Sequence, residues 1–145
     1  MLDVSIRAGI LNLLLELRDK HKITYFFITH DLAVASYIGD RIAIMYLGKL
    51  MELAPTRELV NNPLHPYAMM LLAAVPTPDP LRKRRRVALK GEPPSPINPP
   101  SGCRFHPRCP YAKPICKEKE PEFREYKPGH FVACHFAGEI NPPKE

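Results

Sequence analysis

The chain has 145 residues, of which 45% are hydrophobic and 25% are charged, and its formal net charge is +6. This length supports one modest globular domain or two small ones, and the longest apolar stretches fall far short of the ~20 residues that span a bilayer. The first residues lack the basic region and apolar run of a secretory signal, so export is not expected. The 18 prolines argue against a single uninterrupted fold.

Hydrophobic patterning predicts two helices and one strand in the first 38 residues. Apolar residues recur at helical spacing over Ile6–Leu17, and Asp3 is placed to cap this helix. The continuous β-branched and aromatic run Ile23–Ile28 predicts a strand buried on both faces, as in a parallel sheet covered by helices. Asp31 is placed to cap a short helix over Leu32–Ile38.

A hairpin and two further helices are predicted next. Strands over Arg41–Tyr46 and Lys49–Leu53 flank a tight turn at Leu47-Gly48, where glycine can adopt a positive φ. Thr56 is placed to cap a short helix, and another helix is predicted over Pro66–Val75.

The composition changes between Pro76 and Pro100, where eight of the 25 residues are proline. The basic run Arg82–Arg86 lies inside this stretch. Such a composition predicts a semi-rigid and mostly extended connector. The basic run is either a solvated charged loop or a contact with an acidic or phosphate-bearing neighbour.

All four cysteines lie beyond this connector, at Cys103, Cys109, Cys116 and Cys134. In a reducing compartment, clustered thiols more often hold a metal or perform redox chemistry than form disulfides. Four converging thiolates suit either tetrahedral Zn²⁺ or a cubic iron–sulfur cluster. The sequence lacks the paired Cys-x2–4-Cys spacing typical of zinc sites, which favours the larger cluster, while zinc, two disulfides and free thiols stay open as alternatives.

Three histidines near the cysteines could replace one of them as a ligand: His106, His130 and His135. We expect each of them at the surface or beside the ligands rather than bound to the metal. A metal bound in so small a segment would supply folding free energy that its own core cannot, so a structural staple is the expected role.

An ordered series of motifs connects the front of the chain with the cysteines. The motifs are Leu2-Asp3-Val4-Ser5, Thr29-His30-Asp31, Asp40-Arg41, Met45–Lys49, Asn62–Tyr67, Gly91–Pro96 and Asn98–Pro110. In this order they resemble the ATP-binding subunits of dipeptide/oligopeptide ABC importers, and the resemblance covers about residues 2–137. The Thr-His-Asp motif is weak by itself, but the complete series is specific.

The resemblance implies an α/β fold. This would be the rear portion of an ABC-ATPase domain, a few-stranded sheet with helices, followed by a Pro-rich linker and a small loop-rich tail with four metal-binding cysteines. It also implies that Cys103, Cys109, Cys116 and Cys134 carry a 4Fe-4S cluster, with zinc as the alternative. The expected domains are 1–75 for the ATPase portion, 76–101 for the basic linker, 102–137 for the metal-binding module and 138–145 for a disordered tail.

The resemblance also implies roles for residues in the front half. Leu2 and Asp3 would contact a paired ATPase domain, and His30 would be the switch histidine that senses the γ-phosphate during catalysis. The 145 residues contain no GxxxxGK[ST] string, no LSGGQ-like signature and no apolar strand that ends in Asp-Glu. ATP and Mg²⁺ are therefore expected only in a full-length parent, and this chain is expected to be inactive alone.

The implied partners are transmembrane permease subunits and a second ATPase subunit, at the cytoplasmic face of the cell membrane. The parent would couple ATP hydrolysis to the uptake of di- or oligopeptides. The alternative is a small metal-dependent nucleic-acid-binding module, suggested by the charge and by Arg82–Arg86. Because aromatic residues do not interleave with that run, no specific nucleic acid is expected. The apolar strand Ile23–Ile28 would lack neighbours, which predicts oligomerisation, strand exchange or marginal stability.

Overall fold

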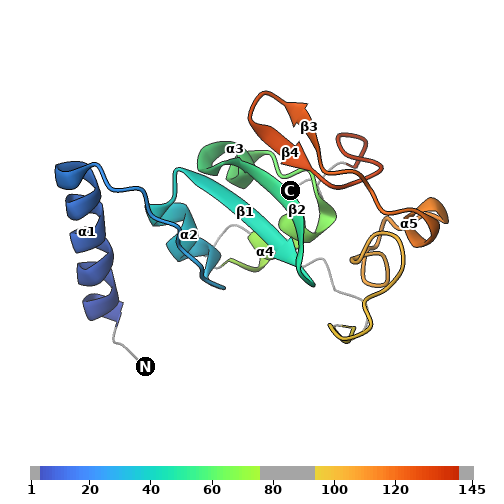
Figure 1. Ribbon diagram of the computed structural model, residues 1–145, viewed down its shortest axis with the longest axis horizontal. Coiled ribbons are helices and arrows are strands. Elements are labelled where there is room, and N and C mark those ends of the chain that lie inside the picture. The colour runs from blue at the N-terminus through green and yellow to red at the C-terminus, as the bar shows by residue number, and fades with distance from the viewer. Residues whose placement is uncertain (1–3, 76–93, 141–145) are drawn as a thin grey trace, which may run out of the picture. The chain divides into compact units, whose positions relative to one another are not determined.

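A computed structural model describes residues 4–75 and 94–140 of the chain (Figure 1). The chain divides into two compact units, Met1–Gly39 and Asp40–Glu145. In the described residues the first unit contains two helices, and the second contains a four-stranded sheet with three short helices. None of the helices in these residues has the length and apolar character needed to cross a membrane.

The first unit consists of α1 (Val4–His21) and α2 (Leu32–Ile38), which confirms both predicted helices. The Asp31 carboxylate caps α2, because its Oδ1 accepts hydrogen bonds from the backbone N–H groups of Ala33 at 3.0 Å and Val34 at 3.2 Å. Within this unit the Tyr37 hydroxyl of α2 also donates to an α1 side-chain amide oxygen, at 2.6 Å. Asp3, the predicted cap of α1, lies outside the described residues.

The predicted strand Ile23–Ile28 is wrong. These residues form neither strand nor helix, and the side chains of Phe26 and Ile28 are 92% and 84% exposed. The apolar pattern indicated burial on two faces, but a strand also needs neighbouring backbones to accept and donate its hydrogen bonds. The described residues of this unit contain no strand that could do so. The apolar run therefore lies on the surface.

The second unit is built on an antiparallel sheet with the strand order β1-β2-β4-β3. The predicted hairpin is confirmed, and Leu47 and Gly48 both have positive φ angles, 45° and 75°, as a type I′ turn requires. β1 alternates exposed and buried residues, so one face packs on the core. The strands are β1 (Arg41–Tyr46), β2 (Lys49–Pro55), β3 (Arg124–Lys127) and β4 (His130–Val132).

The helices of the second unit are α3 (Thr56–Asn61), α4 (Pro66–Ala74) and α5 (Ile115–Glu118). The prediction of α4 is confirmed to within one residue. The prediction that Thr56 caps α3 is wrong, because the chain passes from β2 directly into the helix and Pro55 occupies the cap position without a side-chain hydrogen bond. Thr56 is the first helical residue, and its backbone N–H donates to Asp40 O at 3.0 Å.

The sheet joins segments that the sequence analysis assigned to different domains. β2 pairs with β4 through Glu52–Val132 and Leu53–Phe131, and Figure 1 shows β4 and β3 beside β2. Phe105, which is fully buried, packs edge-on against Tyr46 with ring centroids 5.2 Å apart. The cysteine-bearing residues 94–140 and the hairpin therefore share one compact unit. The basic run Arg82–Arg86 lies outside the described residues.

Candidate metal centre

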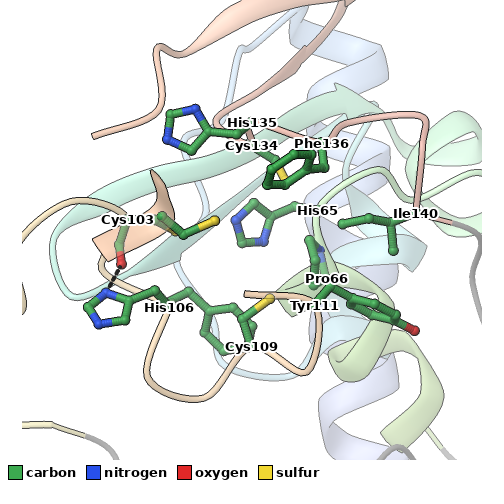
Figure 2. A pocket seen from close by; sticks show the side chains of 12 residues that line it. His65, Pro66, Cys103, His106, Cys109, Tyr111, Cys134, His135, Phe136 and Ile140 are labelled. Carbon is green, nitrogen blue, oxygen red and sulfur yellow. Dashed lines mark hydrogen bonds between the residues drawn. The ribbon is translucent and has the colours of Figure 1, made fainter. Parts of the chain in front are cut away.

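The four predicted cysteines come together in the structure. The side chains of all four line one cavity, and Figure 2 shows those of Cys103, Cys109 and Cys134 around it. All four are free thiols. Sequence spacing therefore identified residues that the fold brings to one place, although they come from three separate segments of the chain.

Cys103 and Cys109 lie on a loop of successive tight turns. The loop is closed by backbone hydrogen bonds from His106 N to Cys103 O, at 2.9 Å, and from Cys109 N to His106 O, at 3.3 Å. Gly102, just before the loop, has a φ of 63°, a left-handed conformation that glycine adopts without strain. These turns direct both cysteine side chains into the same cavity.

Cys116 and Cys134 reach the cavity from α5 and from the end of β4. The Cys103 N–H donates to Cys116 O at 2.8 Å, which joins the loop to α5. Cys134 packs against a buried cluster of Leu64, Val132 and Ala137. The sheet thus fixes one side of the cavity, and the loop with α5 closes the other.

Burial makes the thiols of Cys103, Cys109 and Cys134 weaker acids. The pKa of Cys109 is raised to about 11 and that of Cys134 to about 12, mainly by burial and to a smaller extent by the neighbouring cysteines. Burial likewise raises the pKa of Cys103. Thiols in this state are protonated at neutral pH, so a cation that binds here has to displace protons. In the described part of the chain, no three or more His, Cys, Asp or Glu side chains are already arranged to hold a metal ion.

Two of the three histidines considered as alternative ligands lie at the cavity. A ring nitrogen of His106 is 2.9 Å from Cys103 O, and one of His135 is 2.9 Å from Lys119 O. Because a carbonyl oxygen only accepts, these nitrogens donate, and both rings lie beside the cysteines as expected. The expectation for His130 is wrong: its side chain is buried on β4, 1% exposed, with Nε2 2.7 Å from Glu52 Oε1.

Sequence reasoning missed the importance of Glu52. Its side chain is fully buried, and besides binding His130 its carboxylate accepts hydrogen bonds from the backbone N–H groups of Leu64, at 2.9 Å, and His65, at 2.7 Å. Burial raises the pKa of Glu52, although these hydrogen bonds oppose the shift. A glutamate inside an otherwise apolar strand was the available signal. Its carboxylate fixes the backbone that leads into α4.

His65 was also missed as a member of the site. It lines the cysteine cavity, is 1% exposed, and occupies the cap position of α4, where its Nδ1 accepts a hydrogen bond from Tyr67 N at 3.0 Å. Burial lowers the pKa of His65 to about 3, so the ring is neutral. The sequence placed it only within the motif Asn62–Tyr67. A histidine directly before a proline that opens a helix was the signal for its capping role.

The site residues predicted in the front half lie either in the first unit or outside the described residues. Leu2 and Asp3 lie outside the described residues. His30 is exposed and lies in the first unit, directly before the Asp31 cap of α2. Its role as a switch histidine stays a prediction. Ile140, predicted to lie in a disordered tail, instead lines the cavity, and Glu139 N donates to Phe136 O at 3.1 Å.

Comparison with known proteins places the chain in a family. Residues 51–116 match the family described as oligopeptide/dipeptide transporter, C-terminal region. Over 136 residues the chain is 58% identical to the oligopeptide transport ATP-binding protein AppF of Bacillus subtilis (strain 168), covering 92% of this chain and 41% of that protein. The chain belongs to the oligopeptide/dipeptide transporter family, in the C-terminal region.

Two further relatives match the chain over a similar length and with similar identity. The chain is 52% identical over 136 residues to the putative oligopeptide transport ATP-binding protein YkfD of Bacillus subtilis (strain 168), covering 92% of this chain and 41% of the relative. It is 53% identical over 134 residues to the probable peptide ABC transporter ATP-binding protein y4tS of Sinorhizobium fredii, covering 92% and 38%. The chain spans about two fifths of the length of these curated relatives.

Proposed function

We propose that this chain forms the C-terminal part of an ATP-binding subunit of a peptide importer, in which its four cysteines hold a metal centre that stabilises the fold. The observation that carries the metal centre is the convergence of four free thiols from three chain segments on one cavity. The importer role is supported by the names of the relatives, which are oligopeptide or peptide transport ATP-binding proteins.

The work of the subunit is divided in this proposal. Nucleotide binding belongs to parts of the subunit that carry a phosphate-binding loop, and His30 would act there as the switch histidine. The subunit would pair with a second ATPase subunit through Leu2 and Asp3, and it would dock on transmembrane permeases at the cytoplasmic face of the membrane. Peptide selection would belong to other subunits.

The centre itself would be a 4Fe-4S cluster, with zinc as the alternative. The four sulfur donors suit either, because soft thiolates bind both zinc and iron–sulfur clusters. The cysteine side chains would have to lose their protons and turn inward, since no ready-made ligand set stands among the described residues. A bound centre would join the Cys103–Cys109 loop, α5 and β4, and its binding free energy would add to the stability of the fold.

The metal content of the chain tests this proposal. After anaerobic purification, we expect iron and acid-labile sulfide in equal amounts and the visible absorbance of thiolate-bound iron. Cys109→Ser and Cys134→Ser should lose most of both, because each removes a ligand. His135→Asn is the matched control: it changes a side chain that lines the same cavity but leaves all four thiols in place.

Two other outcomes of this experiment are informative. A colourless protein with one zinc ion per chain would replace the cluster by zinc and leave the structural role intact. A wild-type chain that binds neither metal under these conditions would contradict the metal centre altogether, because the four clustered thiols would then have another role.

A further inference from the structure

We propose that His65 donates a hydrogen bond from Nε2–H to the sulfur atoms of the centre held by the four cysteines, and thereby raises its reduction potential. The inference rests on the proposed metal centre. It concerns a residue outside the cysteine motif, and it assigns His65 as a hydrogen-bond donor to the centre rather than a ligand.

The position of His65 places it at the sulfur atoms. Its ring lines the same cavity as the four cysteines, and only 1% of the residue is exposed. In Figure 2 the ring lies among the side chains of Cys103, Cys109 and Cys134. A buried polar ring that faces a cavity lined by sulfur has few partners other than what the cavity holds.

The hydrogen bond at the other ring nitrogen decides what His65 can do there. Nδ1 accepts a hydrogen bond from Tyr67 N at 3.0 Å, so Nδ1 carries the lone pair and the ring proton is on Nε2. A histidine that binds a metal shows the opposite arrangement, with its second nitrogen donating to a carbonyl or carboxylate. His65 is therefore built as a donor. Among the residues that the structure describes, Nε2 has no hydrogen-bond acceptor.

The donor is held rigidly. Glu52 accepts from the His65 backbone N–H at 2.7 Å, and the His65 carbonyl accepts from Met69 N at 3.1 Å in the first turn of α4. The ring also packs against the fully buried ring of Phe105, with centroids 5.8 Å apart. Because the backbone and one ring nitrogen are already engaged, little further ordering is needed for Nε2–H to bind a sulfur atom.

The electrostatic consequence has a definite sign. Reduction of a cluster adds negative charge that spreads onto its sulfur atoms, so a hydrogen-bond donor stabilises the reduced state more than the oxidised one. Hydrogen bonds to the sulfur atoms are among the features that set the reduction potential of such clusters. Removal of the donor should therefore shift the potential to a more negative value.

His65→Asn separates the donor role from the capping role. Asparagine is a favoured N-cap and can still accept the Tyr67 N–H, but its side chain is too short to carry a donor as far as Nε2. The wild-type 145-residue chain and the variant are purified anaerobically. Their iron and sulfide contents are measured, and each protein is titrated with dithionite to obtain its reduction potential. We expect similar iron contents, a more negative potential in the variant and a changed iron–sulfur stretching pattern in the resonance Raman spectrum.

Two further variants sharpen the test. His65→Gln keeps an amide donor of greater reach and should stay closer to the wild-type potential. His135→Asn changes another histidine of the cavity, one whose ring already donates to Lys119 O, and should leave the potential unchanged. If His65→Asn cannot hold iron, His65→Gln is compared with the wild type instead. Because glutamine keeps a donor, a clearly more negative potential in His65→Gln would contradict the proposal.

The outcomes distinguish this inference from the proposed function. A wild-type chain without iron and sulfide overturns the iron–sulfur cluster, and the donor role falls with it, whether or not the chain holds zinc instead. A wild-type chain that holds a cluster, with His65→Asn matching its potential and Raman spectrum, overturns the donor role alone. His65 would then be a helix cap that happens to border the cavity.

Discussion

Glu52→Ala is expected to lower the free energy of unfolding by about 3–5 kcal/mol. The wild-type carboxylate is fully buried and accepts hydrogen bonds from Leu64 N, His65 N and His130 Nε2. Its removal leaves two backbone N–H groups and a buried imidazole without their acceptor. Urea denaturation of the full chain, followed by circular dichroism, measures the loss as a lower midpoint.

Glu58→Ala is the matched control for this change. Glu58 lies on α3 with its Oε1 3.9 Å from Nδ1 of the same histidine, His130, but it is solvent-accessible and is also paired with Lys127. Exposed pairs are screened by water, so its removal should change the midpoint little. Equal midpoints for the two variants would show that the buried carboxylate contributes no more than a surface charge, contrary to the structural interpretation.

The correct predictions from the sequence depended on local signals. The apolar spacing of α1, the Asp31 cap of α2 and the two positive φ angles at Leu47-Gly48 are each determined within a few residues, so neighbours in the sequence suffice to predict them. The run Ile23–Ile28 failed because its pattern records only that the residues are apolar. Whether they form a strand depends on backbone partners that the pattern does not contain.

The missed features depend on contacts between distant residues. β3 carries exposed side chains throughout, so it shows no alternation, and β4 pairs with a strand almost eighty residues earlier in the chain. The same separation hides the Glu52–His130 pair. Thiol chemistry indicated that the cysteines would converge, but nothing in their spacing shows that the start of α4 brings His65 to the same cavity. The sequence indicated that His65 caps α4, but it did not indicate that His65 lies at the cysteine cavity.

Gly102→Ala is expected to disturb the cysteine loop. Gly102 has a φ of 63°, and an added Cβ would lie 2.5 Å from Cys116 O and 2.8 Å from the carbonyl of Lys117. Both neighbours belong to the backbone of α5, where Cys116 O also accepts the hydrogen bond from Cys103 N. The left-handed conformation and the overlap together should cost about 2–5 kcal/mol.

Gly129→Ala separates these two costs. Gly129 also has a positive φ, 74°, in the turn between β3 and β4, but no atom lies within 4 Å of the position that a Cβ would take. It should therefore lose only the conformational part, about 1–2 kcal/mol. Because Gly102 adjoins Cys103, its variant should also bind less iron per chain, whereas Gly129→Ala should bind as much as the wild type. Equal losses of stability and of iron in the two variants would mean that the approach of the loop to α5 does not govern the shape of the cysteine cavity.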